Sequence, residues 1–193
     1  MPSRSPVAPC ALRLLQQKFV AEAPNQVWPA DVTYLATGEG GLHLAAVLDL
    51  ATREVVGSGD GRRAVAPRSM REHVRAELTC AALTMATHRQ RPAPGLLHHS
   101  DRGGQYAADD CRKPLGAAGM QQSMSRRGNC CDNAPMESFF HTLKGELAHH
   151  RRWATRDEAR RDVFAYVETY YNRQRIHSSL GYRTPEQMER TAA

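Results

Sequence analysis

The sequence predicts an α/β fold in which a mixed β-sheet is flanked by helices. Three segments rich in β-forming residues, 26–36, 42–51 and 53–59, follow one another with short links, which favours an antiparallel meander. Apolar residues then recur near helical spacing over residues 67–89, and the run R-P-A-P-G ends that helix. Because strands and helices alternate after this point, we expect crossover connections in the second half of the sheet.

The second half of the chain is expected to contain strands at 95–101 and 120–125, helices at 105–113, 136–150 and 155–171, and a short last helix after Pro185. Pro114 should end or kink the helix before it, since proline removes a helical hydrogen bond. Asn133 can cap the helix that follows it, and Pro135 is tolerated in the first turn. Pro29 is an awkward residue in the first strand because it cannot donate to a ladder.

Length and composition fit one domain with short extensions. The chain has 193 residues, 41% of them hydrophobic, which is enough for one core. We expect a tail over residues 1–24, a core over 25–150 and a helical extension over 151–193. The formal charge of +6 favours an anionic partner without naming it.

The sequence contains no run of about 20 apolar residues and no secretory leader pattern, so neither a membrane partner nor export is expected. Its five cysteines are odd in number and lack C-x-x-C spacing, which favours reduced thiols over a disulfide or zinc. The adjacent His98 and His99 should point to opposite faces of a strand and cannot both face one metal ion.

Three acids stand out by their position. Asp31 lies within a β-rich segment, Asp101 ends an apolar strand at a glycine-rich turn, and Glu137 lies in the first turn of a helix. Carboxylates from separate elements that meet at one sheet edge can bind Mg²⁺ without histidine or cysteine. Each acid alone is as well explained as a cap, a turn residue or a solvated side chain, and Asp49 shows that an aspartate in an apolar strand is not decisive.

The motifs around these acids resemble a known family. They are W-P-A-D-V-T-Y, H-H-S-D-R-G-G-Q-Y, S-M-S-R-R-G-N-C-C-D-N-A-P-M-E-S-F-F-H-T-L-K and the ending Y-Y-N-R-Q-R-I-H-S-S-L-G-Y-R-T-P-E-Q. Together they resemble the integrase core of OrfB-type insertion-sequence transposases, which share their catalytic core with retroviral integrases. The resemblance covers about residues 24–190, and 35 residues separate Asp101 from Glu137, as in the D-x35-E pattern of that family.

The resemblance implies a ribonuclease H-like fold, a mixed five-stranded sheet flanked by helices, with a C-terminal helical extension. It implies that Asp31, Asp101 and Glu137 bind two Mg²⁺ ions, or Mn²⁺, and catalyse DNA nicking and 3′-hydroxyl strand transfer. Asp31 would bridge the two ions, while Asp101 and Glu137 would each favour one. The implied partners are transposon ends and target DNA, and the implied location is the cytoplasm, associated with the nucleoid.

Four further residues are candidates for DNA contacts. Lys144 and His141 stand at i+7 and i+4 from Glu137 on one helix, and Arg126 and Arg127 lie in the loop before it. Lys144 would bind a phosphate as a point charge, although a solvated surface lysine explains it equally well. Phe140, with neighbouring apolar residues, should form the buried stripe of the same helix.

The chain also departs from the family. Several positions that usually carry an aromatic do not, including Gly41 and His43, which should cost packing energy. The resemblance predicts that a helix-turn-helix region for reading element ends is missing, so the chain would be N-terminally truncated. A separate helix-turn-helix protein or full-length transposase could then be a partner, besides a second copy of this chain. Two alternatives remain: an inactive remnant that binds DNA or full-length transposase, and a ribonuclease H-fold nuclease without strand transfer.

Overall fold

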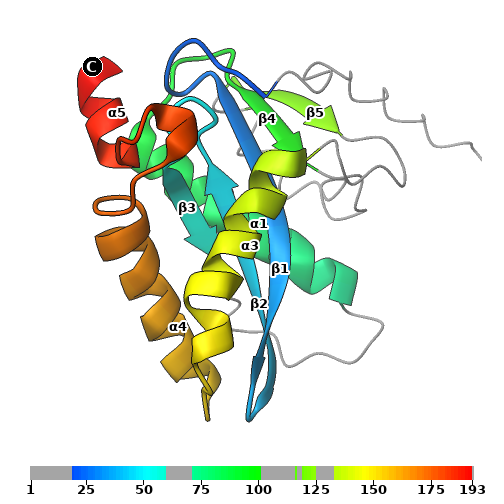
Figure 1. The fold of residues 1–193 in the computed structure, drawn as a ribbon. Helices are drawn as coiled ribbons and strands as arrows, with labels where there is room; N and C mark the ends of the chain where they lie inside the picture. The colour runs from blue at the N-terminus through cyan, green and yellow to red at the C-terminus, as the bar shows by residue number, and fades with distance from the viewer. Residues whose placement is uncertain (1–18, 60–70, 101–115, 117–118, 125–132, 193) are drawn as a thin grey trace, which may run out of the picture.

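The computed structural model describes residues 19–59, 71–100, 116, 119–124 and 133–192 (Figure 1). Its five strands are β1 (Val27–Thr37), β2 (Gly40–Leu48), β3 (Val55–Gly59), β4 (Leu97–Ser100) and β5 (Gln121–Met124). They form one sheet in the order β3-β2-β1-β4-β5, in which β1, β2 and β3 are antiparallel while β4 and β5 run parallel to β1. The predicted mixed five-stranded sheet and its antiparallel meander are confirmed.

The helices are α1 (Arg71–Gln90), α3 (Ala134–Glu146), η4 (Ala148–His150), α4 (Arg156–Ala165), η5 (Tyr166–Tyr171), η6 (Ser178–Leu180) and α5 (Pro185–Ala192). The helix expected over 105–113 falls outside the described residues. The helix expected over 155–171 begins as predicted, with a capping box at Thr155, but its last six residues form the π-helix η5. Periodicity alone does not distinguish these two helix types, so the change to a π-helix could not be predicted from the sequence.

Two hydrophobic clusters cover the two faces of the sheet. One packs Trp28, Ala30 and Val47 against α1, and the other packs Leu35 and Leu44 against α3, α4 and η5. Figure 1 shows α1 on one side of the strands and α3 with α4 on the other. The fold therefore has three layers, with the sheet in the middle and helices packed on both of its faces.

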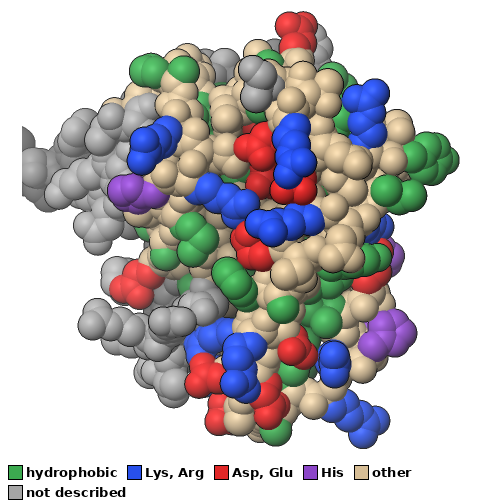
Figure 2. All heavy atoms as spheres, turned by 90° about the vertical axis from the view of Figure 1, so that its left-hand side faces the viewer, with side chains coloured by type: hydrophobic (Ala, Val, Ile, Leu, Met, Phe, Trp, Pro, Cys, Tyr) green, Lys and Arg blue, Asp and Glu red, His purple; other side chains and the backbone are tan. Residues whose placement is uncertain are grey.

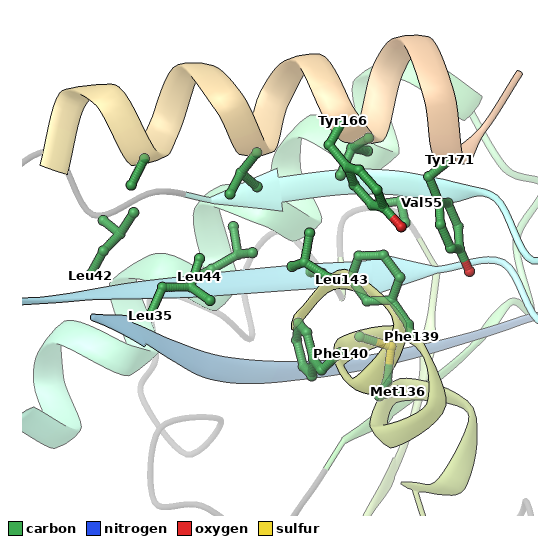
Figure 3. Packing of buried hydrophobic residues seen from close by; sticks show 14 of the residues in the cluster. Leu35, Leu42, Leu44, Val55, Met136, Phe139, Phe140, Leu143, Tyr166 and Tyr171 are labelled. Atoms are coloured by element: carbon green, nitrogen blue, oxygen red, sulfur yellow. The ribbon is translucent and has the colours of Figure 1, made fainter. Parts of the chain in front are cut away.

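The α3 face of the sheet is filled by a stripe of large side chains (Figure 3). Met136, Phe139, Phe140 and Leu143 of α3 are all buried, at helical spacing. Phe139 meets the ring of Tyr171 edge to face, with ring centroids 5.0 Å apart. The predicted apolar stripe of this helix is confirmed.

The structure explains two residues that were unexpected in their strands, Pro29 in β1 and Gly41 in β2. Antiparallel pairing of β1 with β2 begins at Ala30, one residue after Pro29, so the missing N–H lies outside that ladder. A Cβ on Gly41 would lie 1.7 Å from a ring carbon of Tyr34, so this ring occupies the space beside Gly41 and also contacts His43. An aromatic ring thus packs at this strand pair, contributed by β1 rather than by β2.

The C-terminal segment is attached to the sheet through Asn172. Its side-chain oxygen accepts from the Val55 N–H at 3.0 Å, and its amide donates to the Val55 carbonyl at 3.2 Å. These are buried bonds to β3, an edge strand of the sheet, and they replace the pairing that a sixth strand would provide. The backbone oxygen of Asn172 also accepts from Glu186 N, which connects α5 to the same residue.

Charges on the outer face of the C-terminal helices are largely paired. Figure 2 shows acidic and basic side chains next to one another over this face. Arg89 bridges Glu54 and Glu168, each at 3.0 Å, and Arg160 pairs with Asp157 within α4. No helix in the described ranges is long and apolar enough to span a bilayer.

One expectation about the cysteines is wrong. Cys80 on α1 is disulfide-bonded, whereas reduced thiols were expected from the odd number and irregular spacing of the five cysteines. The other four cysteines fall outside the described residues.

We predict that Asn172→Ala destabilises the fold by about 3 kcal/mol, because it leaves a buried N–H and a buried C=O of Val55 unpaired. Urea unfolding followed by circular dichroism measures this change. The exposed Gln174→Ala is the control and should shift stability by less than about 0.5 kcal/mol. Equal midpoints for the two variants would show that Asn172 does not attach the segment to the sheet.

Candidate active site

The position of Asp31 follows from the alternation of side chains along β1. Trp28 and Ala30 belong to the cluster under α1, while Leu35 belongs to the cluster under α3. Asp31 therefore faces the α3 side, and its pairing partner on β2, Ala46, lies in the α3 cluster as well. The carboxylate is partly buried, and its Oδ1 accepts from Val32 N at 2.7 Å.

β4 ends beside Asp31. Its last residue, Ser100, pairs in parallel with Ala30, the residue before Asp31. Asp101 follows Ser100 in the sequence but lies outside the described residues, as do Arg126 and Arg127. The structure therefore places Asp31 and the strand leading to Asp101 at the same level of the sheet, without placing Asp101 itself.

Helix α3 carries Glu137 in its first turn, on the exposed side of the helix. Asn133 precedes this helix, but its side chain makes no capping bond, so the expected capping role is wrong. Its amide instead donates to the Ala30 carbonyl at 3.2 Å, within the buried interior. This bond connects the start of α3 to β1 at the residue before Asp31, so Asn133 is a positioning residue that the sequence did not reveal.

Glu137, His141 and Lys144 follow one another at i, i+4 and i+7 on α3, as expected. Glu137 and His141 are exposed, and Lys144 is partly exposed in the last turn. Among the described residues, Glu137 has no hydrogen-bond or ion-pair partner. These side chains are accessible to a ligand that approaches the outer side of α3.

Asp49 provides an internal comparison for Asp31. Its Oδ1 accepts from Ala51 N and Thr52 N at 2.9 Å each, and its Oδ2 accepts from Asn25 N and Trp28 Nε1. With both oxygens engaged by donors that shape a turn, Asp49 is a structural residue. An aspartate near a strand end is thus not enough to define a site, as the sequence already suggested.

His98, in β4, is fully buried. Burial, with a smaller contribution from His99, lowers the pKa of His98 to about 4, so the ring is neutral near pH 7. Nδ1 of His99 lies 3.1 Å from the Ser123 hydroxyl on β5. Within the described part of the chain no three histidine, cysteine or acidic side chains form a group that could bind a metal ion.

The oxygen-only donor set of the candidate site fits a hard divalent cation. Carboxylates are the ligands preferred by Mg²⁺ and Mn²⁺, and neither His98 nor His99 is exposed enough to contribute a nitrogen. Asp31 on the α3 side of the sheet and Glu137 on α3 come from the two elements that Asn133 holds together. A third oxygen ligand would have to come from outside the described residues.

Comparison with known proteins identifies the class. The chain matches the integrase core domain family model over residues 21–130, and a second integrase core domain model over residues 118–185. The chain belongs to the integrase core domain family.

Its relatives come from insertion elements. It is 51% identical to an uncharacterised 31 kDa protein of the element IS600 from Shigella sonnei, over 93% of this chain and 61% of the relative. It is 42% identical to the IS904 transposase of Lactococcus lactis, over 92% and 66%. It is 44% identical to the transposase InsF of IS3 from Escherichia coli, over 94% and 59%. The chain thus spans about three fifths of the length of these relatives.

Solved structures confirm the ribonuclease H-like fold. The catalytic core domain of HTLV-2 integrase in complex with magnesium aligns with a TM-score of 0.61 at 14% identity, over 88% of this chain and 99% of that chain. A chain of the simian T-cell lymphotropic virus intasome aligns with a TM-score of 0.65 at 14% identity, over 88% of this chain and 55% of that chain.

We predict that His98 makes the fold less stable as the pH falls. The unfolded chain takes up a proton near pH 6.5, whereas the folded chain resists protonation until about pH 4, so stability is lost as the pH falls from 6.5 toward 4. This amounts to about 2 kcal/mol between pH 6.5 and pH 5. His98→Met should therefore lose about 2 kcal/mol less than the wild type over this range.

The pH comparison requires a variant because other groups titrate in the same range. Burial and the nearby Arg175 also lower the pKa of His177 to about 4, and burial raises the pKa of Glu54 to about 7, which has the opposite sign. Urea unfolding at both pH values measures the difference, and the exposed His149→Gln should behave as the wild type. An unchanged pH dependence in His98→Met would contradict a neutral buried ring.

Proposed function

We propose that this chain is the catalytic core of a DNA transposase that nicks DNA at element ends and joins the 3′-hydroxyl to target DNA. The observation that carries the proposal is the attachment of α3, with Glu137 in its first turn, to β1 next to Asp31. It is supported by membership of the integrase core domain family and by insertion-element relatives at 42–51% identity.

Asp31, Asp101 and Glu137 would bind the divalent cations, two Mg²⁺ or Mn²⁺ ions, with Asp31 as the shared ligand. When bound, such a pair activates an attacking hydroxyl and stabilises the leaving oxygen of an in-line displacement. The magnesium in the HTLV-2 integrase structure, a protein with the same fold, supports this assignment.

The chain's own residues would hold the candidate acids in position and bind the DNA backbone. Asp31 pairs with Ala46 of β2, and Ala30, the residue before it, pairs with both β2 and β4. The bond from Asn133 fixes the distance from β1 to the start of α3. Lys144 and His141 would contact the DNA backbone along α3, together with Arg126 and Arg127, which precede α3 in the sequence. Such contacts position the scissile phosphate without reading sequence.

The proposed partners are element ends and target DNA, together with further copies of the chain. HTLV-2 integrase core is described in dimeric and trimeric forms, and the simian viral protein in an intasome, which supports an oligomer on DNA. A separate helix-turn-helix protein or a full-length transposase is a further proposed partner.

We predict that Asp31→Asn, Asp101→Asn and Glu137→Gln each reduce Mg²⁺-dependent strand transfer by about 100-fold or more, beyond the roughly 10–100-fold cost of altering an outer partner of a metal ligand. A strand-transfer assay with pre-cut element ends measures this. Asp157→Asn is the matched control, because Asp157 is an exposed acid of α4 that pairs with Arg160 of the same helix. Chelation should abolish joining, and Mn²⁺ should restore it.

The same assay separates the alternatives. Joined product that is lost in the three variants supports the transposase. Cleavage without joining supports a nuclease, and the absence of both reactions supports an inactive remnant. Metal binding has its own readout, since Mn²⁺ should raise the Tm of the wild type more than that of Asp31→Asn. Joining that survives Asp101→Asn would remove the assigned acids from the mechanism.

A further inference from the structure

A pocket of about 560 Å³ opens beside the candidate active site. It lies between the first turns of α3, the turn after β2 and the segment after η5. Leu48, Phe139 and Tyr171 form its apolar base, while Ser138 and Arg53 contribute polar groups. This volume is within the range of sites that bind small groups or parts of larger ligands.

The pocket lies on the face of the sheet that carries Asp31 and is covered by α3. Leu48 lies two residues beyond Ala46, the pairing partner of Asp31 on β2. Strand spacing and rise place the Cα atoms of Asp31 and Leu48 about 8 Å apart. Ser138 on the pocket wall directly follows Glu137. A DNA strand held at the acids could therefore reach the pocket within a few nucleotides, at about 3.4 Å of rise each.

Arg53 is a cation without a partner within the described ranges. Its guanidinium neither donates a hydrogen bond nor forms an ion pair there. Burial lowers the pKa of Arg53, and the nearby Tyr171 and Asp49 only partly oppose this. Both oxygens of Asp49 already accept backbone hydrogen bonds, at 2.6 Å from Asn25 N and 2.9 Å from Ala51 N and Thr52 N, so this acid does not bind Arg53 directly.

The backbone at Arg53 is held in an unfavourable conformation. Its φ of 61° lies in the left-handed region, which a non-glycine residue rarely adopts. Its N–H bonds to the Asp49 carbonyl at 2.8 Å, which fixes the turn. Tyr182, on the pocket rim, has the same φ of 61°. Strained residues of this kind concentrate where a side chain must be presented to a ligand.

Two other arginines on this side of the sheet are already engaged. Arg175, also on the pocket wall, donates to Glu146 at 2.8 Å. Arg156, which contacts the start of β2 and lies away from the pocket, donates to the carbonyls of Gly41 and Glu39. Arg53 is different because its charge is left for a ligand that brings its own acceptors.

We propose that this pocket binds a phosphodiester group of the DNA strand held at the candidate active site, with Arg53 as the charged donor. The hydroxyl groups of Ser138, Ser178 and Ser179 line the same pocket and suit phosphate oxygens. The inference rests on the proposed function for the identity of the ligand. The phosphate chemistry alone would also suit free phosphate or a nucleotide, which the test distinguishes.

The test measures DNA affinity of the 193-residue chain across a salt series, by fluorescence anisotropy with a duplex carrying a single-stranded 3′ overhang, in EDTA. Arg53→Gln should weaken binding about 5- to 10-fold at low salt and reduce the slope of log K against log[salt] by about 1. Arg91→Gln is the matched control. Arg91 is exposed, also has positive φ (45°), and directly follows α1 on the opposite face of the sheet. Its slope should match the wild type.

Arg53→Gly separates binding from folding, because glycine relieves the positive φ. This variant should keep or raise the Tm while losing the same affinity as Arg53→Gln. Equal slopes for Arg53→Gln and Arg91→Gln would overturn the proposal. So would a thermal shift by inorganic phosphate or thymidine monophosphate that needs Arg53 while the DNA slope stays unchanged, since the pocket would then serve free phosphates.

The binding test contains no metal and no strand joining, so it fails or succeeds independently of the proposed chemistry. An Arg53-dependent slope in a chain that joins no DNA would refute the catalytic proposal and leave the phosphate pocket standing. Strand transfer by a chain whose salt slope does not depend on Arg53 would refute the phosphate pocket and leave the catalytic proposal standing.

Discussion

The alternation of side chains along β1 is the constraint on which the rest of the structure depends. β1 is the central strand, so both of its faces are covered, with Trp28 and Ala30 under α1 and Leu35 under α3. A slip of one residue would exchange the two faces and place Asp31 under α1. The large residue Trp28, fully buried and hydrogen-bonded to Asp49, opposes such a slip because it fits only one side. Packing of the core thereby fixes the direction of a polar side chain.

Helix α3 is placed by a second, polar interaction. Its apolar stripe would tolerate sliding along the sheet, since large side chains can repack at modest cost. The buried bond from Asn133 to the Ala30 carbonyl sets its position along β1 instead. At the far side, Asn172 attaches the C-terminal segment to β3, and the π-helix η5 before it directs Tyr171 toward Phe139. Two asparagine amides thus define how the helices lie on the sheet.

The sequence predicted the elements better than it predicted these connections. Strands β1 to β5 and the helices α3 and α4 could be found because alternation, helical spacing and the capping box at Thr155 are local patterns. Asn133 was assigned a capping role because its position before a helix is typical of one, whereas its real partner is 103 residues away in the sequence. Long-range partners of this kind leave no local signal. The pocket around Arg53 was missed for the same reason, since its walls come from four separate segments: Phe19, the turn after β2, helix α3 and the stretch from Tyr171 to Tyr182.

Comparison of Asp31, Asp49 and Arg53 shows what separates a candidate site from a structural residue. Asp49 is satisfied at Oδ1 by donors of its own turn and at Oδ2 by Asn25 N and Trp28 Nε1, and the turn holds Arg53 at positive φ. Asp31 Oδ1 accepts from the next residue in the strand, Val32 N, and this bond shapes no turn. A satisfied acid stabilises the fold, and a cation left without a partner costs stability unless a ligand compensates it. The edge of the sheet beside α3 therefore combines a backbone held in place by hydrogen bonds such as those of Asp49 with two charged groups, Asp31 and Arg53, that do not stabilise a turn through their side chains.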